Sequence, residues 1–203
     1  MPETLQNLLR AVPLSSDQLY LLLGVAAGIA ALLYAARERL FNWREERRLK
    51  RALRRLGARA LHDIALNDGT GGEVAIDHLL LTAEGVLVVG VKRFSGVIFG
   101  GPQTDQWTQV INRCSYKFPN PDDYLQRQIE AIRLLAPGIT VSGIHLFTHG
   151  ATFPKGKPLN VLLAREVRQQ APRLRRIPKP LRQAWNQLVR DLPGHAPASP
   201  EPR

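Results

Sequence analysis

Two short hydrophobic runs with a turn between them lie in the middle of the chain. They cover residues 74–81 and 86–91, are rich in Val, Ile and Leu, and flank residues 82–85, which end in a glycine. Runs of this length around a short loop that contains Gly are typical of a β-hairpin. The sequence therefore predicts a pair of antiparallel strands at its centre.

The turn also fixes the register of this hairpin. With Leu81 opposite Val86, counting back along both strands places Asp77 opposite Gly90. Because side chains alternate along a strand, we expect Asp77, position 90 and Lys92 to share one face of the sheet.

The other elements follow from hydrophobic periodicity. An amphipathic helix is predicted over residues 41–57, where Leu49, Ala52, Leu53 and Leu56 form one apolar stripe. The same reasoning predicts strands at 60–66, 140–147 and 159–163, a loop at 112–123 and a helix from Pro121 to Pro137. Between 94 and 107 it predicts a tight turn with Phe99 and Trp107 packed in the core. A last amphipathic helix is predicted at 181–192, where it packs on the domain. The order of helix, three strands, helix and strand predicts a mixed α/β fold.

An unbroken apolar run precedes this domain. Residues 19–36 contain no charge and no proline, and Tyr20 and Tyr34 stand near the ends of the run. A core helix would show a polar stripe, whereas a membrane span is apolar all round and carries aromatic residues at its interfaces. We therefore expect a transmembrane helix at residues 19–36.

Charges around this run predict its orientation. Arginines and lysines accumulate after it, at positions 37, 39, 44, 47, 48, 50, 51, 54 and 55. By the positive-inside rule the protein is a single-pass protein of the cytoplasmic (inner) membrane, with the N-terminus outside and the C-terminal domain in the cytoplasm. A cleaved signal peptide, the alternative, would carry its positive charge before the apolar run. Gly24 and Gly28 are spaced for helix packing, so a homodimer is a further hypothesis.

The overall charge indicates an anionic partner. The 203 residues carry a net charge of +11, and the pI is about 10.6. Nucleic acid is one such partner, and anionic lipid headgroups near the basic juxtamembrane helix are another. A single cysteine, Cys114, excludes an internal disulfide framework.

The predicted hairpin carries an acid and an amine that suggest two readings. Asp77 and Lys92 on one face can form an ion pair at the end of a sheet. Alternatively, they can belong to a metal-dependent phosphodiesterase site, in which carboxylates bind a hard cation and the ammonium group offsets charge in the transition state. The hairpin pattern alone leaves both readings open.

Short motifs around this hairpin resemble the NERD (nuclease-related) domain, a branch of the PD-(D/E)xK restriction-endonuclease-like superfamily. They occur in order within residues 40–135: Ile76-Asp77-His78, Val91-Lys92, Phe94-Ser95-Gly96, Ile98, Gly100, Trp107 and Asn120-Pro121. The resemblance implies a restriction-endonuclease-like core, a Mg²⁺ (or Mn²⁺) cofactor and phosphodiester hydrolysis. It also implies nucleic acid as the partner, DNA in preference to RNA.

The chain departs from the family pattern at one important position. Where the family has Glu-x-Lys at the end of the second hairpin strand, this chain has Gly90-Val91-Lys92. One of the two carboxylates that the family uses to hold the metal is therefore missing. We expect weak or lost nuclease activity, since fold alone does not carry function.

The resemblance also suggests the remaining site residues. The expected catalytic residues are Asp77, Lys92 and Glu46, and the expected metal ligands are Asp77, Glu46 and the carbonyl of Val91. Glu46 is equally explained by a salt bridge with Lys50 at i to i+4.

A helix that follows the hairpin offers a replacement for the lost acid. Glu130 is the candidate, although a surface ion pair with Arg127 and Arg133 explains it as well. Either Gln126 or Gln128 corresponds to the glutamine that the family has on this helix.

Three hypotheses follow for the whole chain: a nucleic-acid-binding module with weak or lost cleavage, an active Mg²⁺-dependent nuclease, and a non-catalytic protein-interaction scaffold at the membrane. The candidate nucleic-acid-binding residues are Arg93, Lys117, Arg127, Arg168, Arg173, Arg175 and Arg176. The predicted organisation is a tail at 1–18, the membrane helix at 19–36, a NERD-like domain at 37–164, a basic linker and amphipathic helix at 165–192, and a disordered tail at 193–203.

Overall fold

A single long helix, α2 (Ser16–Leu56), opens the computed structural model, which describes residues 15–67, 71–170 and 176–192. The two helical stretches predicted at 19–36 and 41–57 are parts of this one helix, because no Gly or Pro interrupts residues 37–40. Its N-terminal part is long and apolar enough to cross a membrane, and none of that apolar window is buried. The chain divides into two compact units, residues 1–44 and 45–203.

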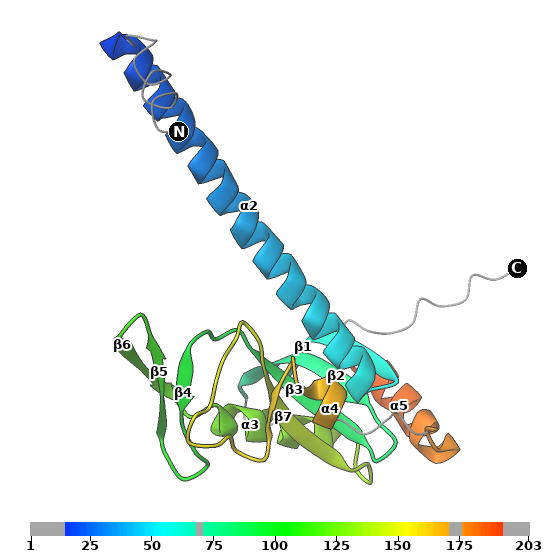
Figure 1. The fold of residues 1–203 in the computed structure, drawn as a ribbon. Coiled ribbons are helices and arrows are strands. Elements are labelled where there is room, and N and C mark those ends of the chain that lie inside the picture. The colour runs from blue at the N-terminus through cyan, green and yellow to red at the C-terminus, as the bar shows by residue number, and fades with distance from the viewer. Residues whose placement is uncertain (1–14, 68–70, 171–175, 193–203) are drawn as a thin grey trace, which may run out of the picture. The chain divides into compact units, whose positions relative to one another are not determined.

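The second unit is built on a mixed sheet with the strand order β1-β2-β3-β7-β8 (Figure 1). Its strands are β1 (Arg59–Asn67), β2 (Glu73–Leu81), β3 (Val86–Lys92), β7 (Val141–Phe147) and β8 (Val161–Leu163). The first three form an antiparallel meander, while β7 pairs parallel with both β3 and β8. The expected α/β fold is confirmed.

Helices cover the two faces of this sheet. On one face α3 (Pro121–Leu135) packs Leu125 and Ile129 against the core, and it comes so close that a Cβ on Gly143 would lie 2.7 Å from Ile129 Cδ1. On the other face the end of α2 buries Leu49 and Leu53 against a second cluster of the sheet. The short helix α4 (Val167–Gln170) follows β8 and contributes Val167 to that second cluster.

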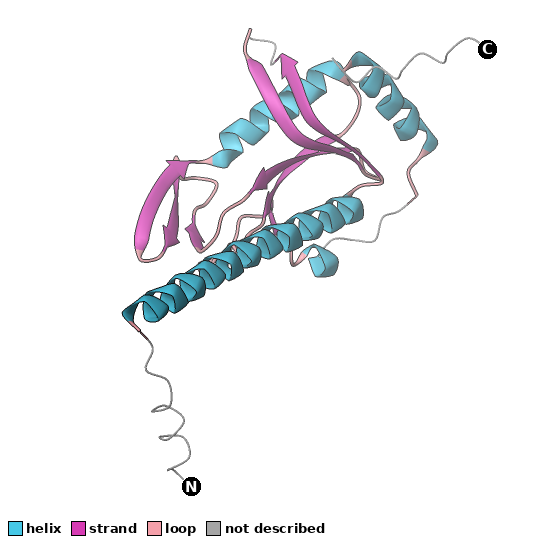
Figure 2. Cartoon of the chain, turned by 90° about the horizontal axis from the view of Figure 1, so that it is seen from above, coloured by secondary structure: helices cyan, strands magenta, loops and turns pink. Residues whose placement is uncertain are grey.

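The predicted hairpin register is confirmed over four residue pairs, from Leu81 opposite Val86 to His78 opposite Val89. The described ladder between β2 and β3 ends at His78, one residue before Asp77. Ile76 and Leu79 are three residues apart, yet both lie in the core cluster under α3, so strict alternation of side chains is broken between them. The long β1–β2 hairpin is strongly curved (Figure 2).

A second sheet, which the sequence pattern did not predict, stands beyond β3. It consists of β4 (Val97–Phe99), β5 (Gln106–Ile111) and β6 (Cys114–Pro119) in antiparallel order, and Figure 1 shows it at one end of the domain. The predicted loop at 112–123 is therefore wrong. Asn112 and Arg113 both have positive φ, 50° and 67°, which is the geometry of a two-residue hairpin turn.

Trp107 anchors this second sheet in a small aromatic core. It is fully buried and stacks on Phe147 with ring centroids 6.3 Å apart, so its predicted packing role is confirmed. Its ring lies against Gly100, where a Cβ would come within 2.2 Å of Trp107 Cδ2. Any side chain at position 100 would therefore displace the indole.

The C-terminal helix α5 (Lys179–Asp191) packs on the domain, as its apolar stripe predicts. Trp185, Leu188 and Leu192 are buried in the same cluster as the residues of α3. The expected disordered tail at 193–203 lies outside the described residues.

Candidate functional site

Asp77 and Lys92 lie where β2 and β3 stop pairing. The carboxylate of Asp77 accepts a hydrogen bond from the backbone N–H of Val91, with Oδ2 2.8 Å from the nitrogen. The carboxylate therefore accepts a hydrogen bond from the residue directly before Lys92, at a point where the backbone pairing of β2 with β3 has ended. Lys92 itself is half-buried, and its carbonyl accepts the N–H of Thr148.

Two side chains of α3 satisfy the backbone of β2 beside this point. Tyr124 Oη accepts the Ala75 N–H at 3.0 Å and lies 3.1 Å from the Ala75 carbonyl, which also accepts from Gln128 Nε2. Backbone groups that lose their strand partner need another one, and α3 supplies it here. Gln128 is buried whereas Gln126 is exposed, so Gln128 is the helix glutamine that reaches the site.

Position 90 faces a buried histidine. Gly90 and His145 are register partners in the parallel pair β3–β7, and a Cβ on Gly90 would lie 3.4 Å from His145 Nδ1. The side chain of His145 is 1% exposed, and its Nδ1 is buried with no hydrogen-bond partner. The position at which the family carries a glutamate is therefore next to a buried ring nitrogen that has no hydrogen-bond partner.

The other nitrogen of His145 is held by a carboxylate. His145 Nε2 lies 2.8 Å from Asp122 Oδ1, and Asn160 Nδ2 donates to the same oxygen at 2.7 Å. An acceptor at Nε2 selects the tautomer with the proton there, which leaves a lone pair on Nδ1. Burial lowers the pKa of His145, the hydrogen bond and charge of Asp122 act in the opposite direction, and the charge of Lys92 lowers it further.

Local sequence explains why Asp122 stands there. Asn120 precedes α3, and its side-chain oxygen accepts the N–H of Asp122 at 3.0 Å, while Pro121 takes the first helical position. This is the usual chemistry of a helix start, and an acidic side chain in the first turn is further favoured by the helix dipole.

The two glutamates of α2 have different environments. Glu46 is 46% exposed and lies 3.9 Å from Lys50 and 3.8 Å from Arg93, so the expected i to i+4 ion pair is present. Glu45 is 4% exposed, accepts the backbone N–H of His149 at 3.0 Å and contacts Arg48. Sequence reasoning missed Glu45, although its position four residues before the buried Leu49 placed it on the apolar stripe of the helix.

Glu130 lies on the exposed side of α3, eight residues after Asp122. Eight residues of helix are about 12 Å, so Glu130 stands roughly two turns from the carboxylate that contacts His145. Its neighbours have other contacts: the Arg127 guanidinium lies 5.2 Å over the Tyr124 ring, and Arg133 donates to the Val141 carbonyl.

The predicted nucleic-acid-binding residues are spread over several elements. Those that the structure describes are exposed: Arg93 after β3, Lys117 on β6, Arg127 on α3, Arg168 on α4 and Arg176 before α5. Arg173 and Arg175 lie outside the described residues.

The donor groups at this site do not fit a Mg²⁺ ion as they stand. Asp77 is engaged by a backbone N–H, Asp122 by His145 and Asn160, and Glu46 by two cations. Within residues 15–67, 71–170 and 176–192, no group of three or more His, Cys, Asp or Glu side chains comes together in a way that could hold a metal ion. A hard cation needs several such oxygen ligands on one centre.

A mixed sheet with Asp77 inside β2, where its pairing with β3 stops, and with Lys92 at the end of β3 is the arrangement of a nuclease-like fold. Residues 42–148 match the nuclease-related domain, about half of the chain, and the chain belongs to this NERD family. An uncharacterized protein of Bacillus anthracis is 32% identical in an alignment of 107 residues that covers 49% of this chain and 50% of that protein. The chain thus spans about half the length of this relative. No solved structure matches the chain.

Proposed function

We propose that this protein binds nucleic acid, DNA in preference to RNA, and that its nuclease-type domain has weak or lost cleavage activity. The observation that carries the proposal is Gly90. At the position of the family's glutamate, the strand offers only a backbone beside the buried Nδ1 of His145.

The carboxylates nearby support the same proposal. Phosphodiester hydrolysis needs oxygen ligands placed around one cation or an equivalent arrangement of charge. Asp77 retains its place in β2, where the pairing with β3 stops, but Asp122 is held by His145 and Asn160, and Glu46 by Lys50 and Arg93. For scale, removing one preorganised electrostatic contact to a transition state commonly costs two to three orders of magnitude in rate, or about 3–4 kcal/mol.

Charge supports the binding half of the proposal. The net charge of +11 favours a polyanion, and Lys92 and Arg93 stand directly at the end of β3. Phosphate contacts of this kind give affinity without reading sequence, so we expect little sequence preference.

The proposed location is the cytoplasmic (inner) membrane, with residues 19–36 spanning it once and the NERD domain on the cytoplasmic side. Support comes from the unburied apolar window of α2 and from the arginines that follow it in sequence. In cells, protease added to the outside should leave the domain intact. Cleavage of the domain by this protease would show the opposite orientation.

The test of function uses the full chain in nanodiscs of zwitterionic lipid. Fluorescence anisotropy with labelled duplex DNA, single-stranded DNA and RNA should show binding that weakens with salt, with a slope of about −0.9 per phosphate contact on duplex DNA. Gel electrophoresis after incubation with Mg²⁺ or Mn²⁺ should show intact substrate. No binding at low salt would overturn the proposal.

Two variants sharpen the activity arm. If the wild type cleaves nucleic acid and both Asp77→Ala and Lys92→Ala abolish that cleavage, the protein is an active nuclease. This result would contradict the proposed loss of activity. Gly90→Glu should produce or increase cleavage if the missing carboxylate is the defect, and Gly90→Gln is its uncharged control.

A further inference from the structure

A groove lined by arginines lies between the C-terminal part of α2 and the segment from the end of β8 through α4. It has a volume of about 950 Å³. Its charged lining consists of Arg48, Arg51, Arg54, Arg55, Arg165 and Arg168. We call it the arginine groove.

Few of these charges are neutralised inside the protein. Within the described part of the chain, two of the six guanidinium groups contact a carboxylate: Arg48 contacts Glu45, and Arg165 lies 3.9 Å from Glu166. Arg55 Nε is buried and has no hydrogen-bond partner. Like charges gathered in a concave surface repel one another unless an anion joins them, so the groove favours a negatively charged ligand.

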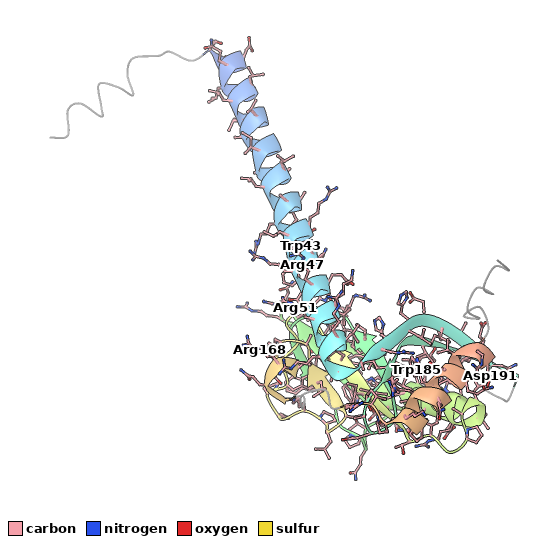
Figure 3. The ribbon with its side chains drawn as sticks, turned by 90° about the vertical axis from the view of Figure 1, so that its right-hand side faces the viewer. Trp43, Arg47, Arg51, Arg168, Trp185 and Asp191 are labelled. Atoms are coloured by element: carbon pink, nitrogen blue, oxygen red, sulfur yellow. The ribbon has the colours of Figure 1, made fainter. Side chains whose placement is uncertain are left out.

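Helix geometry arranges one wall of the groove as a row. Arg48, Arg51 and Arg55 are spaced i, i+3 and i+7, which places them on one side of α2 over about 10 Å of helix length. The opposite wall carries Arg165 and Arg168. Figure 3 shows Arg51 on α2 and Arg168 on α4 on neighbouring elements. A ligand in the groove would therefore meet cations from two sides.

We propose that the arginine groove is a binding site for the sugar–phosphate backbone of a nucleic acid. Guanidinium groups bind phosphate oxygens bidentately, and phosphates that advance about 3.4 Å per nucleotide along each strand match a row of this length with about three contacts. The other lining side chains are Ala52, Ala164 and Val167, which are small and aliphatic. Since none of the lining residues is aromatic, the groove holds the backbone without stacking on bases, and binding is independent of sequence.

The shape of the groove favours a polymer strand over a lipid surface. A bilayer is flat on this scale and is bound by protruding basic side chains together with large apolar residues that insert into it. The arginine groove instead carries its charges on two elements, and its remaining lining side chains, Ala52, Ala164 and Val167, are too small to insert into a bilayer. It shares no residue with the site around Asp77, Gly90 and His145, so it is a second contact surface.

The proposal rests on the proposed function, because nucleic acid is the ligand in both. The test compares Arg51→Glu/Arg168→Glu with the control Arg113→Glu/Arg182→Glu, which makes the same charge change at exposed arginines outside the groove. All proteins are full-length in zwitterionic nanodiscs, and the probe is labelled duplex DNA. A milder pair, Arg51→Gln/Arg168→Gln, keeps the test valid if charge reversal disturbs folding as judged by circular dichroism.

We expect the groove pair to lose DNA affinity at least tenfold and to show a shallower salt dependence by about two phosphate contacts. The control pair should lose less than threefold. Equal losses in both pairs, or no loss in the groove pair while the wild type binds DNA, would overturn the groove and leave the proposed function standing. Absence of DNA binding by the wild type would overturn both.

A final arm separates the membrane alternative. Vesicles that contain phosphatidylglycerol are added to the complex of wild-type protein and DNA. One outcome would refute the proposal and assign the groove to anionic lipid. In that outcome these vesicles displace DNA, phosphatidylcholine vesicles do not, and the displacement is absent with the Arg51→Glu/Arg168→Glu variant. Retention of DNA would support it.

Discussion

Asp122 holds two side chains at the candidate site, and its replacement by alanine tests that contact directly. The substitution leaves the Nε2–H of His145 without an acceptor in a place where the ring is 1% exposed. A buried donor without a partner costs about 1–3 kcal/mol. Loss of the acid from the first turn of α3 adds about 0.3–1 kcal/mol. We therefore expect Asp122→Ala to lower the free energy of unfolding by about 1.3–4 kcal/mol.

The expected change is measurable by thermal unfolding of the full chain in detergent, followed by tryptophan fluorescence at pH 8. For a chain of about 200 residues, 1 kcal/mol corresponds to about 2–4 °C, so Tm should fall by about 3–16 °C. Asp122→Asn keeps an acceptor oxygen and should lose much less. If Asp122→Ala melts within a degree of the wild type, the contact between Asp122 and His145 does not form in solution.

The same histidine gives the protein a pH dependence. Its pKa is lowered in the folded state by burial, so below the ordinary value of 6.5 the unfolded chain binds more protons than the folded one. The contribution of His145 to stability is therefore complete above pH 6.5 and is lost as the pH falls from there towards the folded-state pKa. His145→Gln should flatten the fall in Tm between pH 7 and pH 5, and an unchanged slope would mean that another group titrates there.

Three further outcomes check other parts of the structure. Trp107→Ala should cost about 3–5 kcal/mol in chemical denaturation, because a fully buried indole leaves a cavity, and a loss below 1 kcal/mol would contradict its packing. Glu45→Ala should lower Tm because it removes the buried carboxylate that accepts the backbone N–H of His149, whereas Glu46→Ala, at an exposed pair, should change Tm little; equal effects would refute the distinction. Deletion of residues 19–36 should move the protein from the membrane pellet to the supernatant after ultracentrifugation, and a protein still pelleted would have another anchor.

Strong periodicity made most of the large elements predictable. The β2–β3 hairpin, α3 with its Asn120-Pro121 start, and α5 with its apolar stripe all stand close to their predicted positions. The hairpin β5–β6 was missed because its turn, Asn112-Arg113, contains no glycine and because most of β6 is exposed, so no alternation marks it.

The site was less predictable than the fold. Asp77 lies inside one predicted strand and Lys92 directly follows the other, and the absence of an acid at position 90 is visible in the sequence. The role of His145 is not visible there, because it lies inside a hydrophobic strand and meets Gly90 only through the parallel pairing of β3 with β7. Contacts between distant segments of this kind depend on tertiary structure and leave no local signal.

The closeness of Gly90 and His145 makes these two positions a coupled pair for anyone who reads related sequences or re-engineers this one. A longer side chain at 90 would grow towards an imidazole nitrogen that already occupies the adjacent space. The residue at 145 should thus influence how a side chain at position 90 is placed, since a Cβ there would lie 3.4 Å from His145 Nδ1. A double-mutant cycle compares the free energy of unfolding of the double variant at 90 and 145 with that of each single variant. It would show whether the two positions are energetically coupled.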